Sequence, residues 1–87
     1  MYKLIFAKRA LKELKSMDPH ISSLIIGWLE KNIDGTNNPR KRGKALVGDK
    51  NNIWRYRIGD YRALCEIVDN EVIVYALKIG HRKEIYK

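Results

Sequence analysis

Apolar side chains recur at helical spacing in two adjacent stretches near the start of the chain. The first stretch, with lysines between its apolar positions, comprises Ala7, Ala10, Leu11, Leu14 and Met17. The second follows Asp18 and Pro19, an N-cap and a proline suited to the first helical position, and ends at Gly35. Its apolar positions are Ile21, Leu24, Ile25, Trp28, Leu29 and Ile33. With a short strand pattern over residues 2–6, this predicts an N-terminal strand followed by an α-hairpin.

Alternating apolar and polar residues predict three further strands, over residues 53–58, 61–68 and 72–79. Gly59-Asp60 and Asp69-Asn70 have the composition of tight turns, so these strands are expected to form an antiparallel meander. The face expected to pack on the helices comprises Trp54, Tyr56, Ile58, Tyr61, Ala63, Cys65, Ile67, Val72, Val74 and Ala76. The predicted fold class is α+β. The intervening residues, 36–52, are predicted to form a long loop anchored to the core by Leu46 and Val47.

Three arginines fall on the other face of this predicted sheet, and the sequence has no further helix to cover them. With a two-residue turn at Gly59-Asp60, Arg57 lies directly across from Arg62, and Arg55 lies two residues away on the same face. Like charges directly opposite each other destabilise a sheet. A sequence that keeps such a pair is expected to hold an anion there, and a phosphodiester is the obvious candidate.

The charge of the whole chain also favours an anionic partner. The 87 residues, expected to form one domain over residues 1–87, carry 18 Lys and Arg against 10 Asp and Glu, a formal net charge of +8. Eight of the basic side chains and two acidic ones fall within residues 40–62. A basic field localised in this way favours nucleic acid or an acidic protein. A solvated charge run is an equally good interpretation for the loop cluster, which comprises Arg40, Lys41, Arg42 and Lys44.

Several classes of protein are excluded. No apolar run approaches the roughly 18–20 residues that span a bilayer, and Lys3 and Lys8 interrupt the start of the chain, so neither a membrane protein nor a signal peptide is indicated and a cytoplasmic protein is expected. The single cysteine, Cys65, lies in an apolar strand and is expected to be a buried small hydrophobe. With His20 and His81 as the remaining candidate ligands, we expect no zinc site, no other metal and no cofactor.

The order of motifs along the chain is distinctive. A strand, two helices and a basic loop precede W-R-Y-R-x-G-x-Y-R at residues 54–62, and G-H-R at 80–82 and Tyr86 follow a hydrophobic strand. This order resembles the RelE toxins of bacterial and archaeal toxin–antitoxin systems. The resemblance implies a RelE-like fold and an mRNA interferase, a small ribonuclease that enters the A site of the 70S ribosome and cuts the mRNA codon there. It also implies a cognate RelB-like antitoxin that holds the toxin inactive.

The resemblance further implies which residues form the site. In that family, basic residues of the hairpin and of the end of the last strand hold the scissile phosphate, and a C-terminal tyrosine contacts an mRNA base. Arg62, Arg82 and Tyr86 match these positions. Arg55 and Arg57 fall where the founding member has two lysines.

Arginine in place of lysine bears on the mechanism. Metal-independent cleavage by attack of the 2′-hydroxyl on the adjacent phosphate needs a proton acceptor, a proton donor and cations around the developing charge. Arginine suits only the last task, because it almost never gives up its proton and its planar fork matches two phosphate oxygens. We therefore expect Arg55 to position the RNA backbone. The phosphate clamp is expected to comprise Arg57, Arg62 and Arg82.

Proton transfer is assigned to His81, which lies near the C-terminal histidine of the YoeB-like members and can change its charge near neutral pH. This assignment expects the chain to leave the sheet at Gly80 and turn His81 toward the basic face; a polar turn residue is the alternative. Tyr86 is expected to stack on a base, with packing on the sheet edge as the alternative. The loop cluster is expected to dock on the ribosome.

Two other functions stay open. A ParE-like gyrase-inhibiting toxin shares the fold but has no nuclease site. A non-catalytic RNA-binding or ribosome-binding module keeps the basic face and does not depend on His81.

Overall fold

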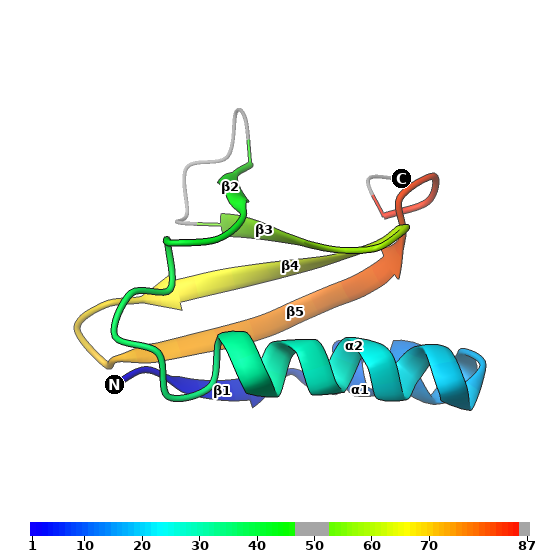
Figure 1. Ribbon diagram of the computed structural model, residues 1–87, viewed down its shortest axis with the longest axis horizontal. Coiled ribbons are helices and arrows are strands. Elements are labelled where there is room, and N and C mark those ends of the chain that lie inside the picture. Colours follow the sequence, from blue (N-terminus) through cyan, green and yellow to red (C-terminus); the bar gives the residue numbers. More distant parts are fainter. Residues whose placement is uncertain (47–52, 86–87) are drawn as a thin grey trace.

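The computed structural model of the chain describes residues 1–46 and 53–85, which form two helices packed on one face of a five-stranded sheet (Figure 1). The elements in chain order are β1 Lys3–Phe6, α1 Lys8–Ser16, α2 Pro19–Asn32, β2 Lys44–Ala45, β3 Ile53–Ile58, β4 Tyr61–Val68 and β5 Ile73–His81. The strands lie in the order β1-β5-β4-β3-β2, with β1 parallel to β5 and the other neighbours antiparallel. The predicted α+β class, helical hairpin and antiparallel meander are confirmed. Within the described part of the chain, no helix is long and apolar enough to cross a membrane.

The helical hairpin forms where the sequence predicts it because its connection is defined locally. Asp18 caps α2, its carboxylate accepting a hydrogen bond from the backbone N–H of His20 at 2.8 Å, and Pro19 occupies the first helical position. Ser22 is buried between the helices, and its hydroxyl donates a hydrogen bond to the carbonyl oxygen of Leu14. This bond joins α2 to the last turn of α1 and satisfies the buried hydroxyl.

The core lies between the helices and the inner face of the sheet. Its buried hydrophobic residues are Ala10, Leu14, Ile25, Leu29, Ile33, Tyr56, Ala63, Cys65, Ile67, Val74, Ala76, Ile79 and Ile85. Burial raises the pKa of the Cys65 thiol to about 12, so this cysteine stays protonated and belongs to the core, as its apolar strand predicts. Tyr56 extends from the core to donate its hydroxyl hydrogen bond to the Pro39 carbonyl oxygen, which ties the loop before β2 to the core.

A β-bulge interrupts the pairing of β4 with β5. The partners on either side of it are Leu64 with Lys78 and Cys65 with Ala76. Strand β5 therefore carries one extra residue, Leu77, and its alternation reverses there. As a result, Ile79 joins Val74 and Ala76 in the core. Every residue of β5 beyond the bulge lies on the opposite face from the one that simple alternation predicts.

The connections differ from the sequence predictions in three places. The turn between β4 and β5 is longer than Asp69-Asn70, because Val68 pairs with Ile73, and Val72 has a φ of 57° and is 39% exposed. Placing Val72 in the core was therefore wrong. Strand β5 continues to His81, so the chain does not leave the sheet at Gly80.

The segment predicted as one long loop contains β2. This strand has two residues, too few to produce an alternating pattern, and pairs with β3. Leu46 is half-buried, and its backbone N–H donates to the Ile53 carbonyl oxygen at 3.1 Å. The second predicted anchor, Val47, lies outside the described residues.

Candidate functional site

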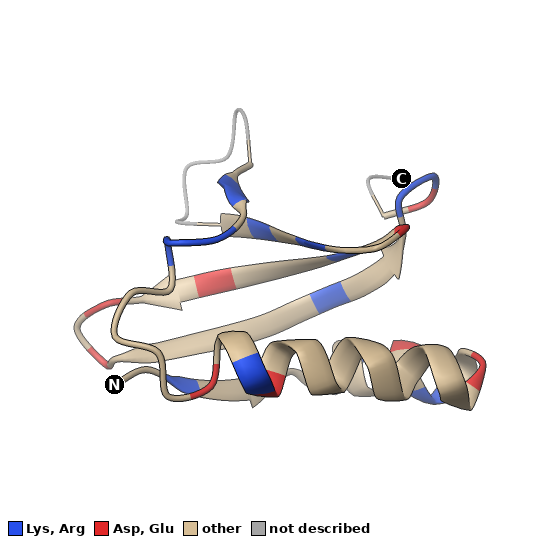
Figure 2. Cartoon of the chain, viewed as in Figure 1, with Lys and Arg blue, Asp and Glu red and all other residues tan. Residues whose placement is uncertain are grey.

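The β3–β4 hairpin gathers arginines on the face of the sheet that the helices do not cover. Its register is the predicted one, with Arg57 directly opposite Arg62. Together with β2 and the loop before β2, these residues surround a hollow of about 290 Å³, which we call the arginine hollow; it is lined by Gly43, Lys44, Arg55, Arg57 and Arg62. Figure 2 shows the basic residues along this loop, on β2 and along β3, whereas α2 carries few charges. Four cationic side chains around one small hollow form a site for an anion.

The two opposed arginines are held differently. Arg62 is folded back over the hairpin turn, where its guanidinium donates to the carbonyl oxygens of Gly59 and Tyr61, both at 3.1 Å. Arg57 is exposed, and its side chain has no hydrogen-bond or ion-pair partner within residues 1–46 and 53–85. The guanidinium of Arg57 therefore has its donors available for a ligand, while Arg62 is oriented in advance by the turn.

The loop before β2 forms one wall of the hollow because it packs tightly on β3. Lys44 pairs with Arg55 across the β2–β3 ladder. Gly43 has a φ of 79°, and a β-carbon there would overlap the Arg55 carbonyl oxygen and lie 2.8 Å from Nε1 of Trp54. Only glycine permits this approach and this backbone conformation. Sequence reasoning did not identify Gly43, although a glycine within a basic run is a visible signal.

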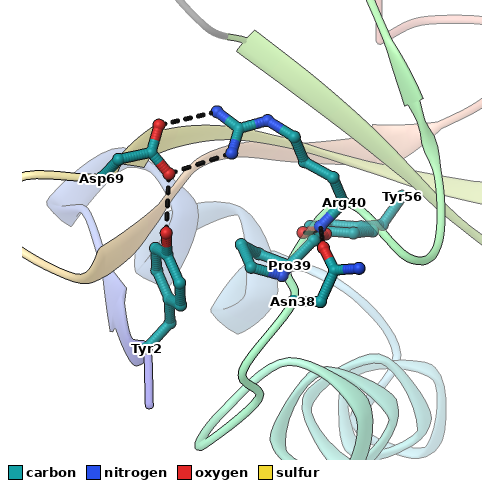
Figure 3. A network of polar contacts seen from close by, with 6 residues as sticks. All are labelled: Tyr2, Asn38, Pro39, Arg40, Tyr56 and Asp69. Atoms are coloured by element: carbon teal, nitrogen blue, oxygen red, sulfur yellow. Dashed lines mark hydrogen bonds and ion pairs between the residues drawn. The ribbon is translucent and has the colours of Figure 1, made fainter.

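Arg40, which the sequence groups with the RNA-binding loop cluster, is held at the surface by an ion pair within the protein (Figure 3). Its guanidinium donates to both carboxylate oxygens of Asp69, at 2.9 and 3.0 Å, and lies 5.9 Å from the ring centroid of Trp54. The Tyr2 hydroxyl also donates to Asp69, at 2.7 Å. The hydrogen bonds from Arg40 and then Tyr2 lower the pKa of the Asp69 carboxyl to about 2. Sequence reasoning missed Tyr2 and assigned Asp69 only to a turn.

The other members of the loop cluster are exposed. Lys41, Arg42 and Lys44 all present their side chains to solvent. The backbone of Arg42 is fixed, since its carbonyl oxygen accepts a hydrogen bond from Nε1 of Trp54. The cluster therefore divides into one engaged arginine and three exposed cations, of which Lys44 lines the arginine hollow.

Arg82 lies beside the turn of the β3–β4 hairpin. Its backbone N–H donates to the Asp60 carbonyl oxygen at 2.8 Å, and its Nε lies 3.8 Å from the Asp60 carboxylate. Arg62 pairs with Gly80, two residues before Arg82, so both arginines belong to the same end of the sheet. Arg82 does not line the arginine hollow.

His81 is not brought together with the arginines. It lies opposite Tyr61, which packs against the core, and the two rings make an edge-to-face contact with centroids 5.4 Å apart. Residues directly opposite each other share a face of the sheet, so His81 faces the helices while Arg62 faces away from them. The bulge in β5 explains why the expected placement on the arginine face was wrong.

His81 lines a second cavity. Its volume is about 570 Å³, and its lining includes Glu13 and Ser16 of α1 together with Tyr61 and Glu84. Nδ1 of His81 accepts a hydrogen bond from the Lys83 backbone N–H at 3.2 Å. Among the described residues, no three His, Cys, Asp or Glu side chains gather to hold a metal ion. Tyr86, the predicted base-stacking residue, lies outside the described residues.

Comparison with known proteins gives consistent matches over almost the whole chain. Residues 4–86 match the family model described as ParE toxin of type II toxin-antitoxin system, parDE. The chain is 34% identical over 86 residues to Toxin RelE3 of Methanocaldococcus jannaschii, a match that covers 97% of this chain and 94% of that relative.

Two solved complexes contain similar chains. One is the toxin–antitoxin complex RelBE2 from Mycobacterium tuberculosis, with a TM-score of 0.82, 25% identity and coverage of 95% of this chain and 93% of that one. The other is the RelB–RelE antitoxin–toxin complex from Methanococcus jannaschii, with a TM-score of 0.68, 30% identity and coverage of 95% of both chains.

Proposed function

Since this chain belongs to the toxins of type II toxin–antitoxin systems and is 34% identical to a RelE toxin, we propose that it is a ribosome-dependent endoribonuclease. It acts as an mRNA interferase in the A site of the 70S ribosome, and thus in the cytoplasm. Cleavage proceeds by attack of a 2′-hydroxyl on the adjacent phosphate, with a 2′,3′-cyclic phosphate and a free 5′-hydroxyl as the products.

The observation that carries this proposal is the opposed pair Arg57 and Arg62 on an open face of the sheet. Two cations held in register repel each other in the free protein, and a phosphate between them would turn that repulsion into attraction. During cleavage the attacked phosphate gains negative charge, so fixed cations stabilise the transition state more than the bound substrate.

We assign Arg57 and Arg62 to the scissile phosphate and Arg55 to the neighbouring backbone. Arg82 approaches from the end of β5, and Lys41, Arg42 and Lys44 contact phosphates of the ribosome or the mRNA. Arginines at these positions supply charge stabilisation and not proton transfer. We assign His81 no proton-transfer role, because its ring packs on Tyr61 on the helix side of the sheet. The prediction that Tyr86 stacks on a base is retained.

A RelB-like antitoxin is the proposed partner. Relatives of this chain form complexes with RelB antitoxins in the solved structures from Mycobacterium tuberculosis and Methanococcus jannaschii. We propose that an acidic or amphipathic segment of the cognate antitoxin covers the arginine hollow and so competes with RNA. Adding the antitoxin should protect β3 and β4 from hydrogen exchange; protection confined to the helices would contradict this placement.

Single-turnover cleavage of mRNA on programmed ribosomes tests the proposed activity. Arg57→Gln and Arg62→Gln each remove one charge-assisted phosphate contact worth roughly 1.5–3 kcal/mol, so each should slow cleavage by about tenfold to a hundredfold. Lys3→Gln removes the same charge from an exposed position of β1 and should cleave like the wild type. Folded arginine variants that cleave as fast as Lys3→Gln would refute the assignment of these arginines.

The name of the matching family model favours one other function, inhibition of gyrase by a ParE-like toxin. Such a toxin inhibits DNA supercoiling and leaves mRNA intact. Purified protein that inhibits supercoiling by gyrase and does not cut mRNA on ribosomes would replace our proposal with this one.

A further inference from the structure

We propose that Arg40, Asp69 and Tyr2 form a clamp that positions the loop wall of the arginine hollow, and that RNA binding depends on this clamp although none of its members lines the hollow. We call these three residues the clamp. The claim that RNA binding depends on the clamp rests on the proposed function, whereas the claim that the clamp positions the loop wall does not.

The clamp joins three separate parts of the chain. Arg40 comes from the loop before β2, Asp69 from the turn between β4 and β5, and Tyr2 from the residue before β1 (Figure 3). Asp69 accepts three hydrogen bonds, two from the Arg40 guanidinium and one from the Tyr2 hydroxyl. A bidentate arginine–carboxylate pair fixes the orientation of both groups. This contact therefore holds the loop four residues before β2.

On both sides of Arg40 in the sequence, the loop is tied to β3 at several positions. The carbonyl oxygen of Pro39 accepts a hydrogen bond from the Tyr56 hydroxyl, and the carbonyl oxygen of Arg42 accepts one from the Trp54 indole N–H. Gly43 then packs directly on the Arg55 backbone, and Lys44 pairs with Arg55 at the edge of the hollow. The guanidinium of Arg40 also lies over the Trp54 ring. Releasing Arg40 therefore removes one of the restraints on the segment that carries Gly43 and Lys44, and shifts that segment toward undocking.

Asp69 is informative because its carboxylate carries the same negative charge as the phosphates of the proposed ligand. An exposed carboxylate in a protein that binds RNA repels phosphate, so its removal should strengthen binding if electrostatics were its only effect. The clamp predicts the reverse sign, because an undocked loop takes Lys44 away from the hollow. Since Asp69 stays ionised with a pKa of about 2, the clamp is closed at neutral pH.

The test compares Asp69→Asn with Glu71→Gln. Both variants remove one carboxylate from the same turn, and Glu71 is exposed with no side-chain partner in the part of the chain that the structure describes. The first readout is hydrogen exchange at the Trp54 indole N–H and the Leu46 backbone N–H. The second is the toxin concentration that gives half-maximal cleavage on programmed ribosomes.

Asp69→Asn should speed exchange at both positions by about twofold to fivefold, as expected for loss of an exposed ion pair, and should leave exchange in the helices unchanged. The half-maximal concentration should rise as the inverse of the fraction of docked loop, so a docked fraction reduced to one third raises it about threefold. Glu71→Gln should leave exchange unchanged and keep or lower the half-maximal concentration. Asp69→Glu, which retains a carboxylate for Arg40, should recover most of both losses.

Each readout can overturn its own part of the proposal. Unchanged exchange in Asp69→Asn would show that the clamp does not hold the loop. Faster exchange with a half-maximal concentration equal to or below that of Glu71→Gln would show that the loop wall does not serve RNA binding. A wild-type protein that does not cleave mRNA at all would overturn the proposed function, while the exchange result would still decide whether the clamp exists.

Discussion

Replacing Arg57 with glutamine should make the protein more stable and less active at the same time. Arg57 lies directly opposite Arg62, and among the described residues its side chain has no hydrogen-bond or ion-pair partner. Glutamine keeps part of the aliphatic stem and removes the charge. The substitution therefore relieves the repulsion across the hairpin and breaks no hydrogen bond or ion pair among the described residues.

The expected gain follows from the cross-strand geometry. Like charges directly opposite each other cost roughly 0.2–1 kcal/mol, and 1 kcal/mol shifts the Tm of a domain of this size by about 4–8 °C. Arg57→Gln should therefore raise Tm by about 1–8 °C at low ionic strength. Arg62→Gln should gain less, because Arg62 also donates to the carbonyl oxygens of Gly59 and Tyr61. Each exposed hydrogen bond that is lost offsets up to about 1 kcal/mol.

Thermal unfolding followed by circular dichroism measures this gain. The control is Lys3→Gln, which removes the same charge from an exposed position opposite the uncharged Ile73. The gain of Arg57→Gln over this control should shrink at about 1 M salt, where the Debye length is about 3 Å. A Tm for Arg57→Gln at or below that of Lys3→Gln at low salt would refute the reasoning and make Arg57 a structural residue.

Three further predictions follow from the structure. Gly43→Ala should lower Tm by more than Gly35→Ala. Both positions have positive φ values, 79° and 81°, but an added β-carbon meets other atoms only at Gly43. The difference in Tm between the two variants therefore isolates the cost of the clash. His81→Ala should cleave mRNA on ribosomes within about threefold of the wild-type rate, whereas a loss of about a hundredfold would restore its role in proton transfer. The Tm difference between wild type and Asp69→Asn should be constant at neutral pH and shrink as pH falls from about 4 to about 2. A carboxyl whose pKa is lowered by folding stabilises the folded state at pH values above its ordinary pKa, and it loses that effect as it is protonated. A Tm difference that grows in acid would contradict the closed clamp.

Local signals in the sequence predicted much of the fold. The cap at Asp18 with Pro19 after it placed the start of α2, and the Gly59-Asp60 turn fixed the register that sets Arg57 against Arg62. Both depend on residues that are neighbours in the chain, and their conformational preferences are known in advance. The central feature of the candidate site was therefore predictable.

Features that depend on distant contacts were not predictable in this way. The bulge at Leu77 depends on how β5 fits β4, and together with the continuation of β5 to His81 it places His81 on the helix side of the sheet. Arg40 and Asp69 are 29 residues apart, so nothing local indicated that this arginine was already paired. A count of basic residues treats Arg40 and Lys44 alike, although one is held by the clamp and the other lines the arginine hollow.

Primer extension on a translated reporter mRNA tests the central claim most directly. Bacteria would express either the wild type or the double variant Arg57→Gln, Arg62→Gln, with the folded state of each protein checked by circular dichroism. We predict cuts within translated codons for the wild type, and their disappearance in the double variant and in an untranslated copy of the reporter. Growth inhibition by the wild type without such cuts, or equal cutting by the folded double variant, would contradict the claim that this protein cleaves mRNA through its opposed arginines.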